Sequence, residues 1–188
     1  MKKSVFAMSV LFAVSLAAAA FAQDFSADMV MTQKNVTTNA KVYMSGEKSR
    51  MEAPGSISIS RMDKKVMWIL MPEQKMYMEQ AFDPSKMMAS SEKVEGEVER
   101  IPLGKDIVDG KTTDKYKVTY QVEGNKNEMF QWIESGSGLP IKSAAVDGSW
   151  SVEYRNIKTG PQPGSLFEVP ADYKKFSMDM PDMGDMMR

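Results

Sequence analysis

The sequence predicts a mostly β protein built around one antiparallel sheet, and three observations support this class. Short segments in which apolar and polar residues alternate recur along the chain, as expected for strands with one buried face. Turn residues such as Gly46 and Asp147-Gly148 separate these segments and can join neighbouring strands directly as hairpins. Little of the chain has helical periodicity, so we expect an open or closed antiparallel sheet and not an α/β fold.

The strands can be placed in chain order from this alternation. Residues 25–33 start the series, with Phe25, Ala27, Met29 and Met31 on one side. Residues 113–122 alternate most regularly and place Tyr116, Val118, Tyr120 and Val122 on one side. Other strands are expected over residues 41–45, 50–52, 57–60, 66–71, 76–78, 128–133, 139–145 and 149–154, followed by an apolar anchor at 166–170.

One helix is plausible between Asp83 and Glu92. Asp83 suits the N-cap, Pro84 suits the first helical position, and Met87 and Met88 would form a short apolar edge. A loop is the alternative, because only these two apolar residues support the periodicity.

The segment from Val66 to Met71 is apolar at every position. A strand with one solvated face would alternate, so both faces of this one must be covered. One face can meet the core or a helix, and the other could meet a lid or a ligand.

The first 22 residues have the pattern of a cleaved signal peptide. Lys2 and Lys3 precede an apolar stretch from Val5 to Ala20, and Ala20-Phe21-Ala22 fits a cleavage site. An uncleaved membrane anchor is the alternative, although the apolar stretch is short for a span. We therefore expect an exported, periplasmic protein with a signal peptide at 1–22, one β-rich domain at 23–176 and a methionine-rich tail at 177–188.

Cysteine and histidine are both absent. Without cysteine there is no disulfide and no residue to carry a lipid anchor after signal cleavage. Without histidine the common nucleophile–imidazole pairs and ordinary zinc or haem sites are excluded. The formal net charge of −1 shows no excess of basic residues of the kind that nucleic-acid-binding proteins carry. We therefore expect no enzyme activity and no cofactor.

Methionine is abundant, with 19 residues. In the body of the chain, methionine can fill the core, or it can line a cavity and repack around a hydrophobic ligand. In the tail, thioethers are soft ligands that prefer Cu(I), so a weak copper site is one hypothesis and a disordered tail the other. The methionines of this hypothetical copper site are Met178, Met180, Met183, Met186 and Met187.

Several stretches resemble a family of exported bacterial proteins described only as a domain of unknown function (number 4412). They are F-S-A-D-M, K-V-Y-M-S-G-E-K-S-R-M-E, D-K-K-V-M-W-I-L-M-P-E-Q-K-M-Y-M-E and L-F-E-V-P-A-D-Y-K-K-F, within Phe25 to Phe176. That family is similar to the periplasmic lipoprotein carriers LolA and LolB. The resemblance implies a curved antiparallel sheet, an unclosed half barrel whose concave apolar face is covered by one or two short helices as a lid. It also implies that Arg50 matches an arginine used near that lid.

The leading hypothesis is a non-catalytic periplasmic binding protein or carrier for a lipid or a lipid-modified protein. Copper binding by the tail, or an envelope module that binds a protein partner along a sheet edge, are the alternatives. The expected ligand-cavity residues are Trp68, Leu70, Met76, Met78, Tyr116, Val118, Tyr120, Phe130 and Trp132.

Overall fold

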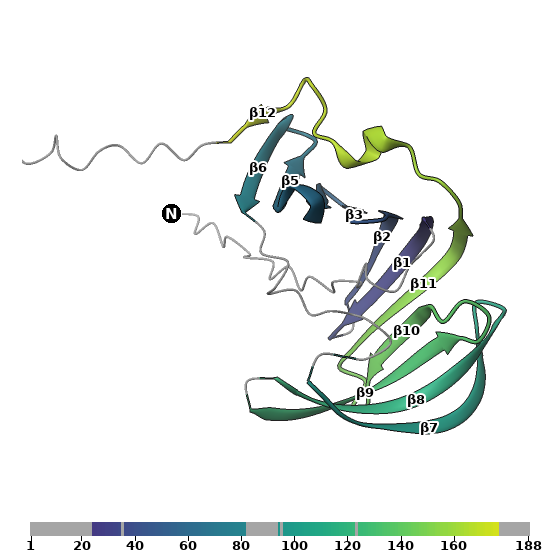
Figure 1. Ribbon diagram of the computed structural model, residues 1–188. Helices are drawn as coiled ribbons and strands as arrows, with labels where there is room; N and C mark the ends of the chain where they lie inside the picture. Colours follow the sequence, from purple (N-terminus) through teal and green to yellow (C-terminus); the bar gives the residue numbers. More distant parts are fainter. Residues whose placement is uncertain (1–23, 35, 82–93, 95, 123, 177–188) are drawn as a thin grey trace, which may run out of the picture.

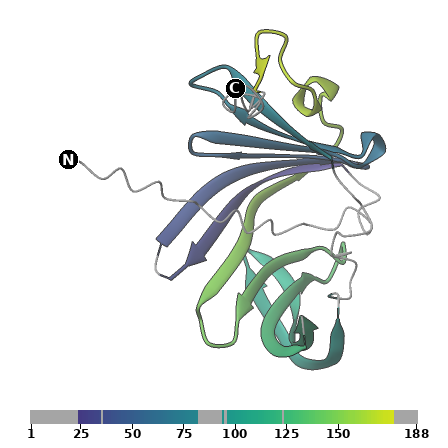
Figure 2. The same cartoon turned by 90° about the vertical axis from the view of Figure 1, so that its left-hand side faces the viewer.

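A computed structural model describes residues 24–34, 36–81, 94, 96–122 and 124–176. Its main element is one sheet of twelve strands in the spatial order β12-β6-β5-β4-β3-β2-β1-β11-β10-β9-β8-β7 (Figure 1). Neighbouring strands are antiparallel, except that β12 runs parallel to β6. The two end strands, β12 and β7, do not pair with each other, so the sheet stays open as a half barrel (Figure 2). The predicted fold class is confirmed.

The helical elements within the described part of the chain are two short 3-10 helices, η1 (Met62–Lys64) and η3 (Gly164–Phe167). No helix in those ranges is both long enough and apolar enough to cross a bilayer. The strands are β1 (Phe25–Gln33), β2 (Val36–Ser45), β3 (Lys48–Ala53), β4 (Ser56–Arg61), β5 (Val66–Met71), β6 (Met76–Ala81), β7 (Glu97–Val108), β8 (Lys111–Val122), β9 (Asn125–Glu134), β10 (Pro140–Ala145), β11 (Trp150–Thr159) and β12 (Lys174–Lys175).

Strand β1 comes first in the chain but lies in the middle of the sheet, between β2 and β11. The pairing of β1 with β11 is shifted between Ser26 and Asp28, opposite Asn156, whose φ of 52° marks a bulge. The Asn156 side chain donates a 2.8 Å hydrogen bond to Asp28 Oδ2, and its backbone N–H donates to Asp109 Oδ2 at 2.9 Å. Bulges bend a sheet, so this anchored irregularity contributes to the curvature.

Several local predictions are confirmed. Strand β1 has the bounds expected from the alternation, and β5 has those of the continuous apolar run. Asp147-Gly148 lies in the turn between β10 and β11. Gly148 has a φ of 74°, which glycine adopts without a steric penalty. No alternating pattern marks β7, and no strand was predicted there. The predicted signal peptide, the helix or loop at 83–92 and the tail lie outside the described residues.

The convex side of β3–β5 is covered by the C-terminal segment. Figure 1 shows η3 on the outside of the curve, above these strands. Phe167 is 1% exposed and packs with Ile59, Trp68 and Leu70. The alternate residues of β5, Met67, Ile69 and Met71, are half-buried on the other side of the sheet.

Two arginines hold this segment in place. Arg61, 5% exposed, donates to the carbonyl oxygen of Phe167 at 3.2 Å and pairs with the carboxylate of Glu168. Its other nitrogens donate to Asp63 at 2.7 and 2.8 Å. Arg50 donates to the carbonyl oxygen of Leu166 at 2.9 Å. Charged donors therefore fix the backbone of η3, while Phe167 supplies the apolar contact.

We expect Phe167→Ala to lower the free energy of unfolding by about 3–5 kcal/mol, because it removes a buried ring and leaves a cavity above Ile59 and Leu70. Urea denaturation measures the effect. Phe176→Ala, at a position that is 37% exposed, is the control and should cost much less. Equal losses from the two changes would contradict the packing described for η3.

The Arg61–Asp63 pair predicts a pH-dependent contribution to stability. Hydrogen bonds from Arg61 lower the pKa of Asp63 from 3.8 to about 2. The stabilisation by ionised Asp63 is therefore complete above about pH 4 and is lost as the pH falls toward 2. Because Asp63 is exposed, solvent screens the ion pair, and Asp63→Asn should cost no more than about 1 kcal/mol at pH 7 and progressively less below pH 4, in urea titrations at each pH.

Glu47→Gln, in the exposed turn between β2 and β3, is the matched control. Its effect should stay small at every pH. An Asp63→Asn penalty that persists at pH 2 would show that the carboxylate charge is not what stabilises the segment.

Candidate functional site

The two faces of the sheet can be followed from strand to strand through the pairing register. Directly opposed residues share a face, and side chains alternate along each strand. Tyr43, Arg50, Ile59 and Trp68 form one row across β2–β5 on the convex face, where η3 lies. The intervening positions, such as Val42 on β2, therefore point to the concave side.

All methionines in the described strands lie on the concave face. Met29 is opposed to Ala40 on β2 and to Tyr154 on β11, and the same side continues to Met129, opposed to Val118 on β8. Because strand positions alternate between faces, this one-sided distribution makes the concave surface a thioether surface. We call it the methionine face; its methionines are Met29, Met31, Met44, Met51, Met67, Met71, Met76, Met78 and Met129.

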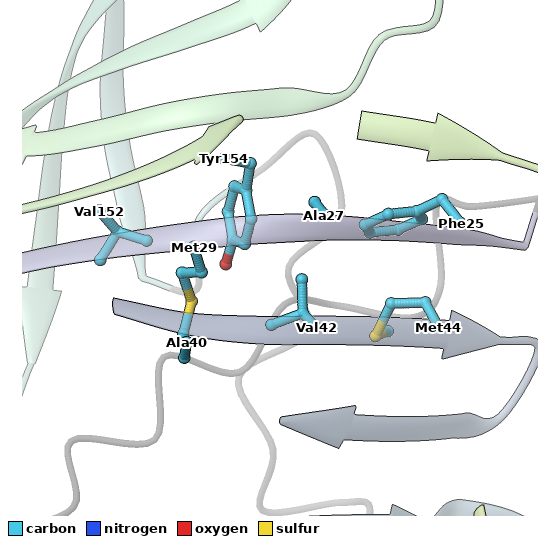
Figure 3. Packing of buried hydrophobic residues seen from close by; sticks show 8 residues of the cluster. All are labelled: Phe25, Ala27, Met29, Ala40, Val42, Met44, Val152 and Tyr154. Atoms are coloured by element: carbon cyan, nitrogen blue, oxygen red, sulfur yellow. The ribbon is translucent and has the colours of Figure 1, made fainter. Parts of the chain in front are cut away.

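The methionine face is buried at its centre and more open toward β6. On β1, β2 and β11 its side chains form one cluster, in which Phe25, Met29, Met44 and Tyr154 are at most 5% exposed (Figure 3). Toward the β6 edge the corresponding residues are only half-buried. They are Met51, Met67, Ile69, Met71, Met76 and Met78.

Small polar residues interrupt this face on β3 and β4. Ser49 and Ser60 oppose each other, and Ser58 lies between Met51 and Ile69. All three serines are half-buried. Their short side chains leave the neighbouring methionines room to change rotamer, which suits a surface that adapts to guests of different shape.

The nine residues predicted to line a cavity are divided between the two faces. Five lie on the concave side: Met76, Met78, Tyr116, Val118 and Tyr120. Trp68 and Leu70 lie on the convex side beneath Phe167. The remaining two, Phe130 and Trp132, are also on the convex side, because the register opposes Trp132 to Lys142 and Phe130 to Ala144. The structure therefore brings the first five together on one curved surface and directs the other four away from it.

Phe130 and Trp132 have cationic neighbours on the convex side. The Lys115 ammonium lies 4.9 Å from the Phe130 ring centre and 4.7 Å from that of Trp132. Trp132 Nε1 donates to Asp106 Oδ2 at 2.9 Å, and this bond is the main cause that lowers the pKa of Asp106. Trp132 is 7% exposed and forms a buried cluster with Val108, Leu139 and Ile141, so the protein's own side chains already cover its ring.

Arg50, the residue expected near a lid, lies on the convex face. Besides Leu166, it contacts Glu52, with Nε donating to Oε1 at 2.7 Å. Its contact is thus with η3 on the outside of the curve. The methionines of the proposed copper site lie outside the described residues.

The residues at the centre of the methionine face were not among the predicted ligand-cavity residues. Tyr154, Val152 and Ala40 belong to its buried cluster, yet none was proposed as a site residue. The alternation of Val152 and Tyr154 along β11 was the available signal.

Two surface depressions adjoin each other on the other side of the sheet. They measure about 570 and 370 Å³ and share Asp28, Lys41 and Asn156 in their linings. Glu52 and Arg155 add charge to the larger one. Both are open to solvent and lined by charged residues, so neither suits an acyl chain, although Met29 and Ala40 also line the larger one.

Solved structures of MucB share this fold at low sequence identity. MucB is 16% identical over 83% of this chain, with a TM-score of 0.57. The MucA/MucB complex of Pseudomonas aeruginosa matches 80% of this chain at 15% identity, with a TM-score of 0.54. This chain spans only 60% and 57% of those two chains. The lipoprotein LppX of Mycobacterium tuberculosis is 11% identical, with a TM-score of 0.46. The match covers 73% of this chain and 88% of LppX.

No curated protein matches the sequence significantly. A family model does match, over residues 26–136, which include all of β1 except Phe25 and the whole of β2 to β9. The resemblance inferred from the sequence motifs is confirmed, and the chain belongs to the family described as a domain of unknown function (DUF4412).

Proposed function

We propose that this protein is an exported, non-catalytic binding protein that holds a lipid, or the acyl chain of a lipid-modified protein, against its concave face. The proposal covers residues 23–176 as the binding unit and the periplasm as its location. The signal-peptide pattern at 1–22 supports export, and the absence of cysteine supports a protein without a lipid anchor.

The observation that carries the proposal is the one-sided placement of the methionines. The convex side of β5 is covered by Phe167, whereas Met67, Ile69 and Met71 on the concave side remain half-buried. Apolar surface that is still accessible can bury a hydrocarbon, and each methylene so buried contributes about 0.8 kcal/mol. A chain of several methylenes could therefore be held without any specific polar contact.

Methionine suits this role better than a branched residue would. Its unbranched, polarizable side chain adapts to guests of different shape, whereas branched side chains fill a fixed volume. The fold supports the proposal in a second way, because an open sheet can widen at its free edges while a closed barrel cannot.

A protein partner is a second candidate, favoured by β7. This edge strand exposes Val98, Ile101, Leu103 and Ile107, with Ile107 at 73%. Pro102 and the register shifts beside it make β7 irregular, which disfavours pairing with a partner's strand, so a partner would contact the exposed apolar side chains. MucB, a protein of similar fold, is known in complex with MucA. A carrier of lipid-modified proteins would use both surfaces.

Native mass spectrometry of the protein purified from a bacterial periplasm tests the main proposal. We expect co-purified acyl species that dissociate on activation and are replaced by added fatty acyl lipids. A preparation free of such species, which also fails to bind a hydrophobic dye, would refute lipid binding and favour the protein-partner candidate.

Met78→Glu should weaken binding of an acyl probe at least about tenfold, because the new carboxylate must lose its hydration when the guest covers it. Displacement of a hydrophobic dye measures the change, and far-UV circular dichroism checks the fold. Asn39→Glu adds the same charge at an exposed convex position and should leave binding unchanged. Equal weakening by both variants would place the guest elsewhere.

A further inference from the structure

The hydroxyl group of Tyr154 is buried and has no hydrogen-bond partner among the described residues. The residue is 4% exposed, and no hydrogen-bond acceptor or donor among the described residues reaches its Oη atom. Burial raises the pKa of this phenol well above its usual range, so the group stays neutral and keeps its proton. It is therefore an available donor in an apolar setting.

The surroundings explain why no protein group serves it. Tyr154 is opposed to Met29 on β1, and Met29 in turn to Ala40 on β2. Figure 3 shows the ring lying across β1, with its hydroxyl oxygen on the side of Met29 and Val42. The buried cluster around it consists of apolar residues, and it contains no charged side chain. Thioether sulfur is only a weak acceptor.

An unpaired buried hydroxyl lowers stability, because it loses its hydrogen bonds to water and gains none. Phenylalanine would fill almost the same space without that cost. The tyrosine is thus unfavourable for folding alone, and buried polar groups of this kind call for a partner from outside the chain.

We propose that Tyr154 Oη donates a hydrogen bond to a neutral carbonyl oxygen, the ester or amide carbonyl at the head of an acyl chain lying on the methionine face. This inference rests on the proposed lipid-binding function and narrows its ligand class. A carboxylate is disfavoured there, since the cluster offers no cation to balance its charge. A plain hydrocarbon would leave the hydroxyl unpaired.

The test uses the delipidated protein and two probes of matched length, methyl hexadecanoate and an n-alkane. Displacement of 1-anilinonaphthalene-8-sulfonate reports the affinity of each. Tyr154→Phe should weaken binding of the ester about two- to tenfold, the effect of one lost hydrogen bond, and leave binding of the alkane unchanged. Tyr43→Phe, a half-buried tyrosine on the convex face, is the matched control and should change neither.

Stability gives an independent readout. Without ligand, Tyr154→Phe should unfold at the same temperature as the natural protein or a higher one, because no hydrogen bond within the protein is lost. A lower melting temperature would mean that the hydroxyl has a partner in the protein itself, which overturns the inference.

The two proposals can fail separately. If both probes bind the natural protein and Tyr154→Phe weakens neither or both equally, the carbonyl contact is refuted while lipid binding stands. If neither probe binds the natural protein, the proposed function fails, and the inference fails with it.

Discussion

The architecture depends on how the two faces of β5 are covered. This strand is apolar throughout, so exposure of either side to water would be costly. Phe167 covers the convex side, and the carbonyl groups of Leu166 and Phe167 are held by Arg50 and Arg61. With that side closed by the protein's own C-terminal segment, the concave side is the remaining apolar surface, and it is the side on which the methionines are found.

Much of the sheet could be predicted from the sequence, because local alternation and turn residues define most of its strands. The alternation identified β1 to the residue and located the centre of β8, and the unbroken apolar run identified β5. It failed for β7, where residues 101–107 are all exposed. An edge strand with neither face buried has no reason to alternate, and Pro102 and Gly104 read as loop residues although they lie in a strand.

The candidate site was harder to predict, for a geometric reason. Alternation shows which side chains of one strand share a face, but not which face lies inside the curve. Tyr116, Val118 and Tyr120 were selected together and do lie together, because they belong to one strand. Trp68 and Phe130 were selected for their apolar character, and only the pairing register shows that both lie on the convex side. Tyr154 could not be selected from the sequence, because its burial arises only in the folded sheet and a local sequence pattern does not show it.

The central position of β1 determines how this sheet can assemble. Phe25 pairs with Met44 on one side and with Thr159 on the other, so the middle of the sheet joins residues from opposite ends of the chain. Contacts between residues so distant in sequence carry a high loop-closure entropy and make folding slow. The local hairpins from β2 to β6 can form early, but the sheet becomes continuous only once β11 is available. Closure of the centre of the sheet is therefore a late step, which waits for the last long strand of the chain.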